Sequence, residues 1–136
     1  MHKKHKEDLE FGLNEENKVY NYLKKFYPNL QRSKKKNDIY DFYDDTQKLY
    51  IELKSRRCCK ATYDSTMFPL NKIKWADQKI DQYKFIFLFN FYDGLYKFDY
   101  TGDDTSYSLR NGGRRDRGIN EYKVYSYIPT KFLQKI

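Results

Sequence analysis

The sequence lacks any long apolar run and has few residues that could act as covalent or metal cross-links. Its two cysteines, Cys58 and Cys59, are adjacent, and neighbouring cysteines rarely bridge each other. No CxxC or paired His/Cys spacing predicts a structural zinc site. The charged N-terminus does not resemble a signal peptide, and no stretch could cross a bilayer. We therefore expect a soluble intracellular protein with reduced thiols and no membrane partner.

Apolar residues are modest in number, at 39%, so the core must rely on 15 tyrosines and 10 phenylalanines. The 136 residues contain no repeat, linker or change of composition, which predicts a single domain, 1–136, with a charged tail of about residues 1–10. Acidic residues are outnumbered by lysine and arginine, 19 to 27, and the net charge is +8. This surplus favours nucleic acid as a partner, although a solvated basic surface gives the same count.

Hydrophobic periodicity and turn residues predict the order of the elements. A helix should begin after Asn14 and stop before Pro28, with an apolar stripe at the spacing of one helix face. The remaining expected elements are a short strand within 29–36, strands at 39–43 and 49–54, a helix at 71–82, strands at 84–91, 95–100 and 122–128, and a flexible basic loop at 111–118. This order predicts an α/β (α+β) fold with a central mixed β-sheet flanked by helices.

The strand at 49–54 carries the first candidate functional residues, Glu52 and Lys54. Alternation places both side chains on one face, opposite Leu49, Ile51 and Leu53. A carboxylate and an ammonium on a core strand are costly unless they face a cleft, a partner or a metal. Taken alone, such a pair is better explained as an ion pair on a solvated sheet face.

A second carboxylate should come from the neighbouring strand, where Asp38 and Asp41 lie on opposite faces. A turn of two or four residues would pair Phe42 with Leu49 and Tyr40 with Ile51, which gathers the apolar residues on one face. The same register would place Asp41 diagonal to Glu52, on its face. A three-residue turn would place Asp38 on the face of Glu52 instead, but would mix the rings of Tyr40 and Phe42 with the charged residues. Patterning favours Asp41 and leaves Asp38 open.

The first helix offers a third carboxylate, Glu16, seven residues before Leu23 on the apolar stripe. Glu16 should therefore point toward the sheet, although a favourable charge near the helix N-terminus explains it nearly as well. Converging carboxylates and a lysine suit phosphodiester hydrolysis, because hard oxygen ligands bind Mg²⁺ or Mn²⁺ with open positions for water and phosphate. Lys54 could orient the attacking water or stabilise developing charge.

Asp41, the run Glu52-Leu53-Lys54 and the upstream Gly12-x-x-x-Glu16 resemble the PD-(D/E)XK restriction-endonuclease-like superfamily. The likeness covers about residues 11–91 and includes the order of elements, although Tyr40 stands where the family often has proline. The run Ile51–Arg56, followed by Tyr63–Met67 and Asn71-Lys72, is similar to small nuclease-like proteins of large DNA viruses and phages.

The resemblance implies a restriction-endonuclease-like core and a Mg²⁺-dependent DNA endonuclease. Metal ligands would be Asp41, Glu52 and the Leu53 carbonyl. Glu16 would shape the site or hold a second metal ion through water. Side chains of these types commonly contact phosphate, so the candidate nucleic-acid contacts near the cleft are Arg56, Thr66, Asn71 and Lys72. The alternative is a catalytically inactive nucleic-acid-binding or virion-associated protein that keeps the fold. The residues do not decide whether the substrate is DNA or RNA, or whether the protein forms a homodimer.

Overall fold

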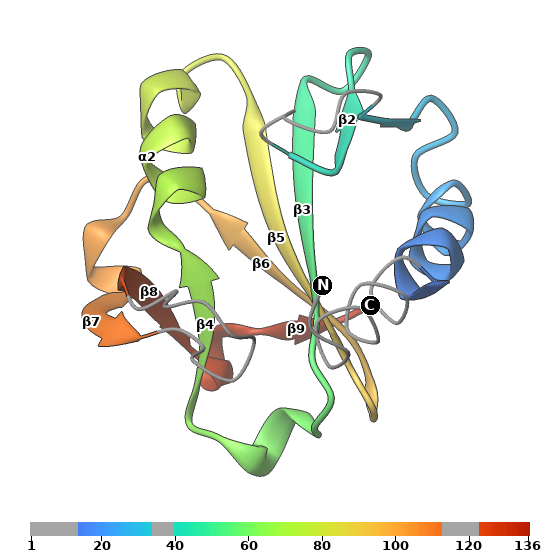
Figure 1. Ribbon diagram of the computed structural model, residues 1–136. Coiled ribbons are helices and arrows are strands. Elements are labelled where there is room, and N and C mark those ends of the chain that lie inside the picture. Colours follow the sequence, from blue (N-terminus) through green and yellow to red (C-terminus); the bar gives the residue numbers. More distant parts are fainter. Residues whose placement is uncertain (1–13, 34–39, 113–122) are drawn as a thin grey trace, which may run out of the picture.

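The computed structural model describes residues 14–33, 40–112 and 123–136. The described residues form two sheets, and the small one packs against one face of the wide one (Figure 1). In spatial order the wide sheet contains β1 (Gln31–Arg32), β2 (Phe42–Asp44), β3 (Leu49–Ser55), β5 (Lys84–Phe91), β6 (Gly94–Tyr100) and β9 (Gln134–Lys135). The small sheet contains β4 (Ser65–Pro69), β8 (Lys123–Pro129) and β7 (Ser108–Gly112).

The wide sheet is mixed, because β3 and β5 run parallel while its other described neighbours are antiparallel. A parallel pair needs a long connection, and here it runs through β4 and helix α2 (Leu70–Lys79). Short 3₁₀ turns occur at Lys60–Thr62, Asp104–Ser106 and Thr130–Phe132. The predicted α+β architecture with a mixed sheet flanked by helices is therefore confirmed.

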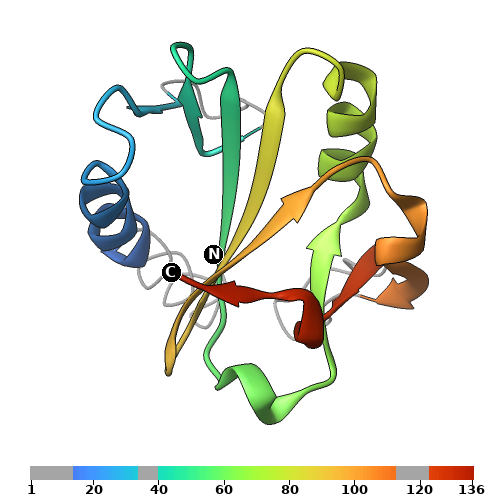
Figure 2. The same cartoon turned by 180° about the vertical axis from the view of Figure 1, so that it is seen from behind.

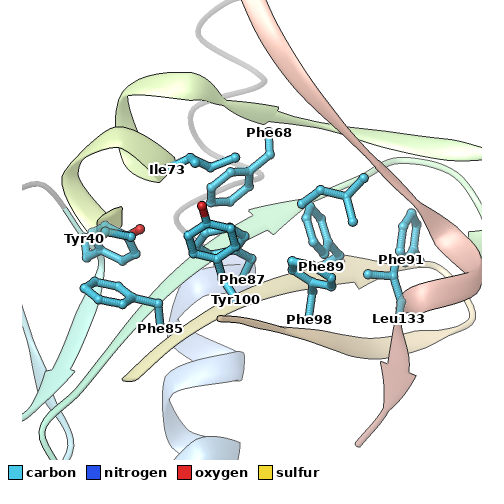
Figure 3. Packing of buried hydrophobic residues seen from close by; sticks show 12 residues of the cluster. Tyr40, Phe68, Ile73, Phe85, Phe87, Phe89, Phe91, Phe98, Tyr100 and Leu133 are labelled. Atoms are coloured by element: carbon cyan, nitrogen blue, oxygen red, sulfur yellow. The ribbon is translucent and has the colours of Figure 1, made fainter. Parts of the chain in front are cut away.

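Each face of the wide sheet has its own apolar core. The first helix, described over residues 14–23, covers one face with Val19 and Leu23 against Ile51 of β3. The other face carries α2 and the small sheet (Figure 2). Its cluster is mostly aromatic, and Figure 3 shows Phe68 of β4 lying over Phe87 of β5, with ring centroids 4.0 Å apart. The tyrosines and phenylalanines thus supply the core, as their numbers predict.

The helix ends differ from the prediction for a local reason. The first helix ends at residue 23 rather than 27, because Lys25 and Phe26 donate to carbonyls only three residues back, at 3.2 and 2.9 Å. Such bonds tighten the last turn of a helix. The second helix ends at Lys79 rather than 82, where the Gln82 amide makes the same kind of bond. No helix in the described part of the chain is long and apolar enough to span a membrane.

Candidate functional site

Strand β3 carries the candidate site on the face that α2 covers. Glu52 is 3% exposed, and its Oε2 lies 3.3 Å from Lys54 Nζ and 3.7 Å from Lys72 Nζ. Lys54 is the next residue on the same face of β3, whereas Lys72 reaches in from the first turn of α2. The predicted Glu52–Lys54 pair is therefore not a solvated surface pair, and a second lysine joins it.

The hairpin register differs by two residues from the prediction. Phe42 pairs with Ile51 rather than with Leu49. The turn occupies residues 45–48, with Gln47 N donating to Asp44 Oδ1 at 3.0 Å and Lys48 in the left-handed conformation at φ 53°. Because the shift is even, it exchanges no faces along the paired strands. Phe42 still packs with Leu49 and Ile51.

Asp41 lies just before β2, in a bend that Ser33 holds in place. The Ser33 amide donates to the Asp41 carbonyl at 2.9 Å, and its hydroxyl donates to the Tyr40 carbonyl. Asp41 Oδ2 in turn accepts the amide of Leu53 at 2.8 Å. The carboxylate thus satisfies a backbone donor of β3 where β2 has not yet begun. The competing residue, Asp38, lies outside the described residues.

Tyr40 is on the opposite face from the one predicted. We expected it to face the Ile51 side with Phe42, but it packs against Tyr50 and Phe85 in the aromatic core. The bend before β2 breaks the two-residue alternation, which explains the difference. The Tyr40 hydroxyl donates to the Lys72 carbonyl at 2.8 Å, so the ring also fixes the start of α2 beside Glu52.

Burial and like charge dominate the electrostatics of the site. Burial raises the pKa of Glu52 most, the neighbouring Asp41 carboxylate raises it further, and the resulting pKa is about 7. Lys54 and Lys72 lower the pKa but do not offset those two effects. In addition, Glu52 Oε1 is buried without a hydrogen-bond partner among the described residues. The negative charge of the Asp41–Glu52 pair is therefore only partly compensated by its neighbours, which favours binding of a cation or of a proton.

Glu16 is near this pair but is engaged elsewhere. Its Oε1 forms an ion pair with Arg32 Nη2 at 3.2 Å. Partial burial raises the pKa of Glu16, Asp41 raises it further, and Arg32 opposes both. The adjacent Glu15 instead accepts from Asn90 Nδ2 at the end of β5, at 2.8 Å. The structure thus brings Glu16 within electrostatic reach of Asp41 and pairs it with an arginine that sequence reasoning did not single out.

The four predicted nucleic-acid contacts lie in different settings. Lys72 is part of the site, and Asn71 beside it is exposed at the start of α2. Arg56 turns inward, where its Nε donates to Thr66 Oγ1 at 3.4 Å and its Nη2 to the Met67 carbonyl. Burial lowers the pKa of Arg56, and Thr66 is itself buried. These two residues link β3 to β4, and their contact with DNA stays a prediction.

The donor set is compatible with a hard divalent cation. Among the described residues, no three His, Cys, Asp or Glu side chains form a ready-made metal cage. Mg²⁺ does not need one, because it keeps several waters and is usually held by one or two carboxylates together with substrate phosphate. Asp41 and Glu52 supply two carboxylates, and the partnerless Oε1 of Glu52 is an available ligand atom.

Comparison of the chain with models of protein families and with curated proteins finds no match.

Proposed function

We propose that this protein is a metal-dependent nuclease that hydrolyses phosphodiester bonds of DNA, with Asp41, Glu52 and Lys54 at its centre. The observation that supports the proposal is the buried Glu52 carboxylate, whose pKa is raised to about 7 beside Asp41 and two lysines. Strongly perturbed acids beside specific charge partners gather at functional sites more often than elsewhere. The resemblance to the PD-(D/E)XK superfamily implies the same activity.

In this proposal Asp41 and Glu52 hold Mg²⁺ or Mn²⁺, and the Leu53 carbonyl is a third ligand. When bound, the ion would lower the pKa of a coordinated water and neutralise charge on the scissile phosphate. Asp41 already fixes its own position by accepting the Leu53 amide. Glu16 stays in place through Arg32 and adds negative charge next to Asp41.

The two lysines contribute positive charge where phosphate would bind. Lys54 is 28% exposed and Lys72 is 15% exposed at the side chain, so both are only partly solvated. An ammonium in such surroundings stabilises developing negative charge more strongly than it would in open water. Lys54 would orient the attacking water, and Lys72 would bind a phosphate oxygen.

One observation favours a second candidate, a nucleic-acid-binding protein without catalysis. Lys54 and Lys72 both lie close to the carboxylate that would hold the ion, and Glu52 is almost fully buried. Lysines in that position can take the place of a cation and leave only a basic surface for DNA. Metal binding separates the two candidates.

The test combines cleavage with metal binding. Wild-type protein is incubated with supercoiled plasmid, branched DNA and RNA in Mg²⁺ or Mn²⁺, beside Glu52→Gln, Asp41→Asn and Asp38→Asn. We expect the first two variants to lose at least about 100-fold in rate, as for other residues that stabilise charge in a transition state, while Asp38→Asn retains activity. Mn²⁺ should also raise the melting temperature of wild type but not of Glu52→Gln.

Two results would contradict the proposal. Equal cleavage by wild type and Glu52→Gln would place any activity elsewhere. DNA binding without cleavage or Mn²⁺ stabilisation would favour the non-catalytic candidate. Loss of activity in Asp38→Asn but not in Asp41→Asn would keep the nuclease and move the ligand to the other aspartate.

A further inference from the structure

The small sheet has two unlike faces. Its inner face packs on the aromatic core through Phe68, Ser126 and Ile128, each fully buried. The register and the alternation of strands place a different set on the outer face. That outer face carries Ser65 and Met67 from β4, Tyr125 and Tyr127 from β8, and Ser108 and Arg110 from β7.

An arginine side chain crosses this outer face. The guanidinium carbon of Arg110 is 3.8 Å from the ring centroid of Tyr127, and Arg110 Nη2 donates to Ser65 Oγ at 2.9 Å. The side chain thus extends from β7 over Tyr127 of β8 to Ser65 of β4. Arg110 is exposed, whereas Tyr125 and Tyr127 are half-buried at the same surface.

The chemistry of this face matches exposed nucleic-acid bases. Bases stack on tyrosine rings and on guanidinium planes, and guanidinium N–H groups suit phosphate oxygens. No Asp or Glu occurs among the paired residues of the described outer face. The chain as a whole carries a net charge of +8, which attracts a polyanion to it.

The outer face continues toward the candidate site. Pro69 is the last residue of β4 on the outer face, and Lys72 follows three residues later. Three residues of chain span at most about 11 Å, and Lys72 Nζ is 3.7 Å from Glu52 Oε2. In Figure 1, α2 follows directly from the upper end of β4. The end of the outer face is therefore within three residues of chain of the lysine that contacts Glu52.

We propose that the outer face of the small sheet binds single-stranded DNA, with bases stacked on Tyr125 and on the guanidinium of Arg110, which the Tyr127 ring supports from below. Its use in presenting a strand to Glu52 rests on the proposed function, whereas the binding itself does not. In duplex DNA the bases are already stacked on one another, so the same face should discriminate in favour of single strands.

The test is fluorescence anisotropy of a labelled thymidine 15-mer and of a duplex of equal length, in EDTA so that cleavage cannot occur. Tyr127→Leu removes a ring, and Arg110→Lys keeps the charge but removes the plane. Each should weaken single-strand binding about 5- to 100-fold, the range for the loss of one stacked base, and change duplex binding much less. Tyr127→Phe should bind as wild type. Tyr92→Ala is the matched control, since Tyr92 is a 66% exposed tyrosine at the β5–β6 turn.

Circular dichroism confirms that each variant is folded before its binding is measured. Wild-type affinity in both Tyr127→Leu and Arg110→Lys, an equal loss in Tyr92→Ala, or no binding of the 15-mer by wild type would overturn the proposal. If wild type cleaves DNA and the outer-face variants bind it normally, this inference is wrong while the proposed nuclease activity holds. Outer-face-dependent binding by a protein that never cleaves would do the reverse.

Discussion

At the scale of single residues, the burial of the Glu52 carboxylate costs free energy, and stability alone does not explain it. A carboxylate that is 3% exposed loses most of its hydration, and a second carboxylate, Asp41, increases the cost. Lys54 and Lys72 recover part of it, yet the pKa of Glu52 is still raised to about 7. Buried charged groups are often no more stabilising than apolar residues of the same volume. A site that needs concentrated negative charge is the simplest reason to keep this one.

The raised pKa predicts how the stability of the metal-free protein depends on pH. The folded-state pKa of Glu52, about 7, is above the ordinary value of 4.5 for glutamate, so the folded protein holds this proton more tightly than the unfolded chain. The resulting stabilisation is complete below pH 4.5 and is lost as pH rises through 7, by an amount on the order of 3 kcal/mol. Urea denaturation in EDTA between pH 5 and 8 measures it.

Glu52→Gln provides the comparison, because glutamine cannot titrate. The free energy of unfolding of wild type should fall relative to that of the variant as pH rises from 5 to 8. The same pH profile for both proteins would show that the Glu52 carboxylate does not titrate in this range. Other titrating groups are common to both proteins and largely cancel in the difference.

At the scale of elements, Arg56 is the link between the strand that carries Glu52 and the small sheet. It follows β3 and bonds to Thr66 and Met67 of β4. Loss of a partly buried, charged donor from its acceptors costs more than loss of a neutral hydrogen bond. We expect Arg56→Ala to lower the free energy of unfolding by about 2–4 kcal/mol, and the exposed neighbour Arg57→Ala to change it by less than about 1 kcal/mol.

Urea denaturation of the two variants checks this expectation, and DNA binding at several salt concentrations adds a second readout. If Arg56 contacted phosphate as the sequence suggested, Arg56→Ala would leave stability unchanged and reduce the salt dependence of binding by about one counterion. That outcome would contradict the structural role described for Arg56.

The sequence predicts some elements well and others poorly, for identifiable reasons. β5 is predicted with its exact bounds, because its continuous apolar run must be buried on both faces. The sequence does not predict β4 or β7, since Ser65–Pro69 belongs to a largely polar connection and ends in proline, and β7 overlaps the expected basic loop. Each is stabilised by pairing with β8, a contact that local periodicity cannot reveal.

The same distinction holds for the candidate site. Alternation within β3 is local, so it places Glu52 and Lys54 correctly on one face. The position of Asp41 depends on a turn that ends at Lys48 in the left-handed conformation. A lysine gives no indication of that conformation in the sequence. Lys72 lies next to Glu52 only because α2 crosses the sheet there. Sequence reasoning named Lys72 as a contact for DNA but could not bring it to the carboxylate.

At the scale of the whole molecule, the described part of the chain has two sheets that share one aromatic core. Phe68 of the small sheet stacks on Phe87 of the wide sheet, and Ile73 of α2 belongs to the same cluster. Trp75, the single tryptophan, packs against this cluster from α2, 5.4 Å from the ring centroid of Tyr40. Tryptophan fluorescence therefore reports on the layer between α2 and the wide sheet.

This shared core predicts that the two sheets unfold together. Phe68→Leu removes the stacked ring and should lower the free energy of unfolding by about 1–3 kcal/mol. Because Trp75 touches the same cluster, its fluorescence and far-UV circular dichroism should shift to the same lower urea midpoint, with coincident curves before and after the change. The matched control is Phe26→Leu, at a 55% exposed phenylalanine, which should leave both midpoints within error. Separate midpoints for the two probes in wild type, or a shift confined to circular dichroism in Phe68→Leu, would mean that the small sheet unfolds independently of the layer that holds Glu52.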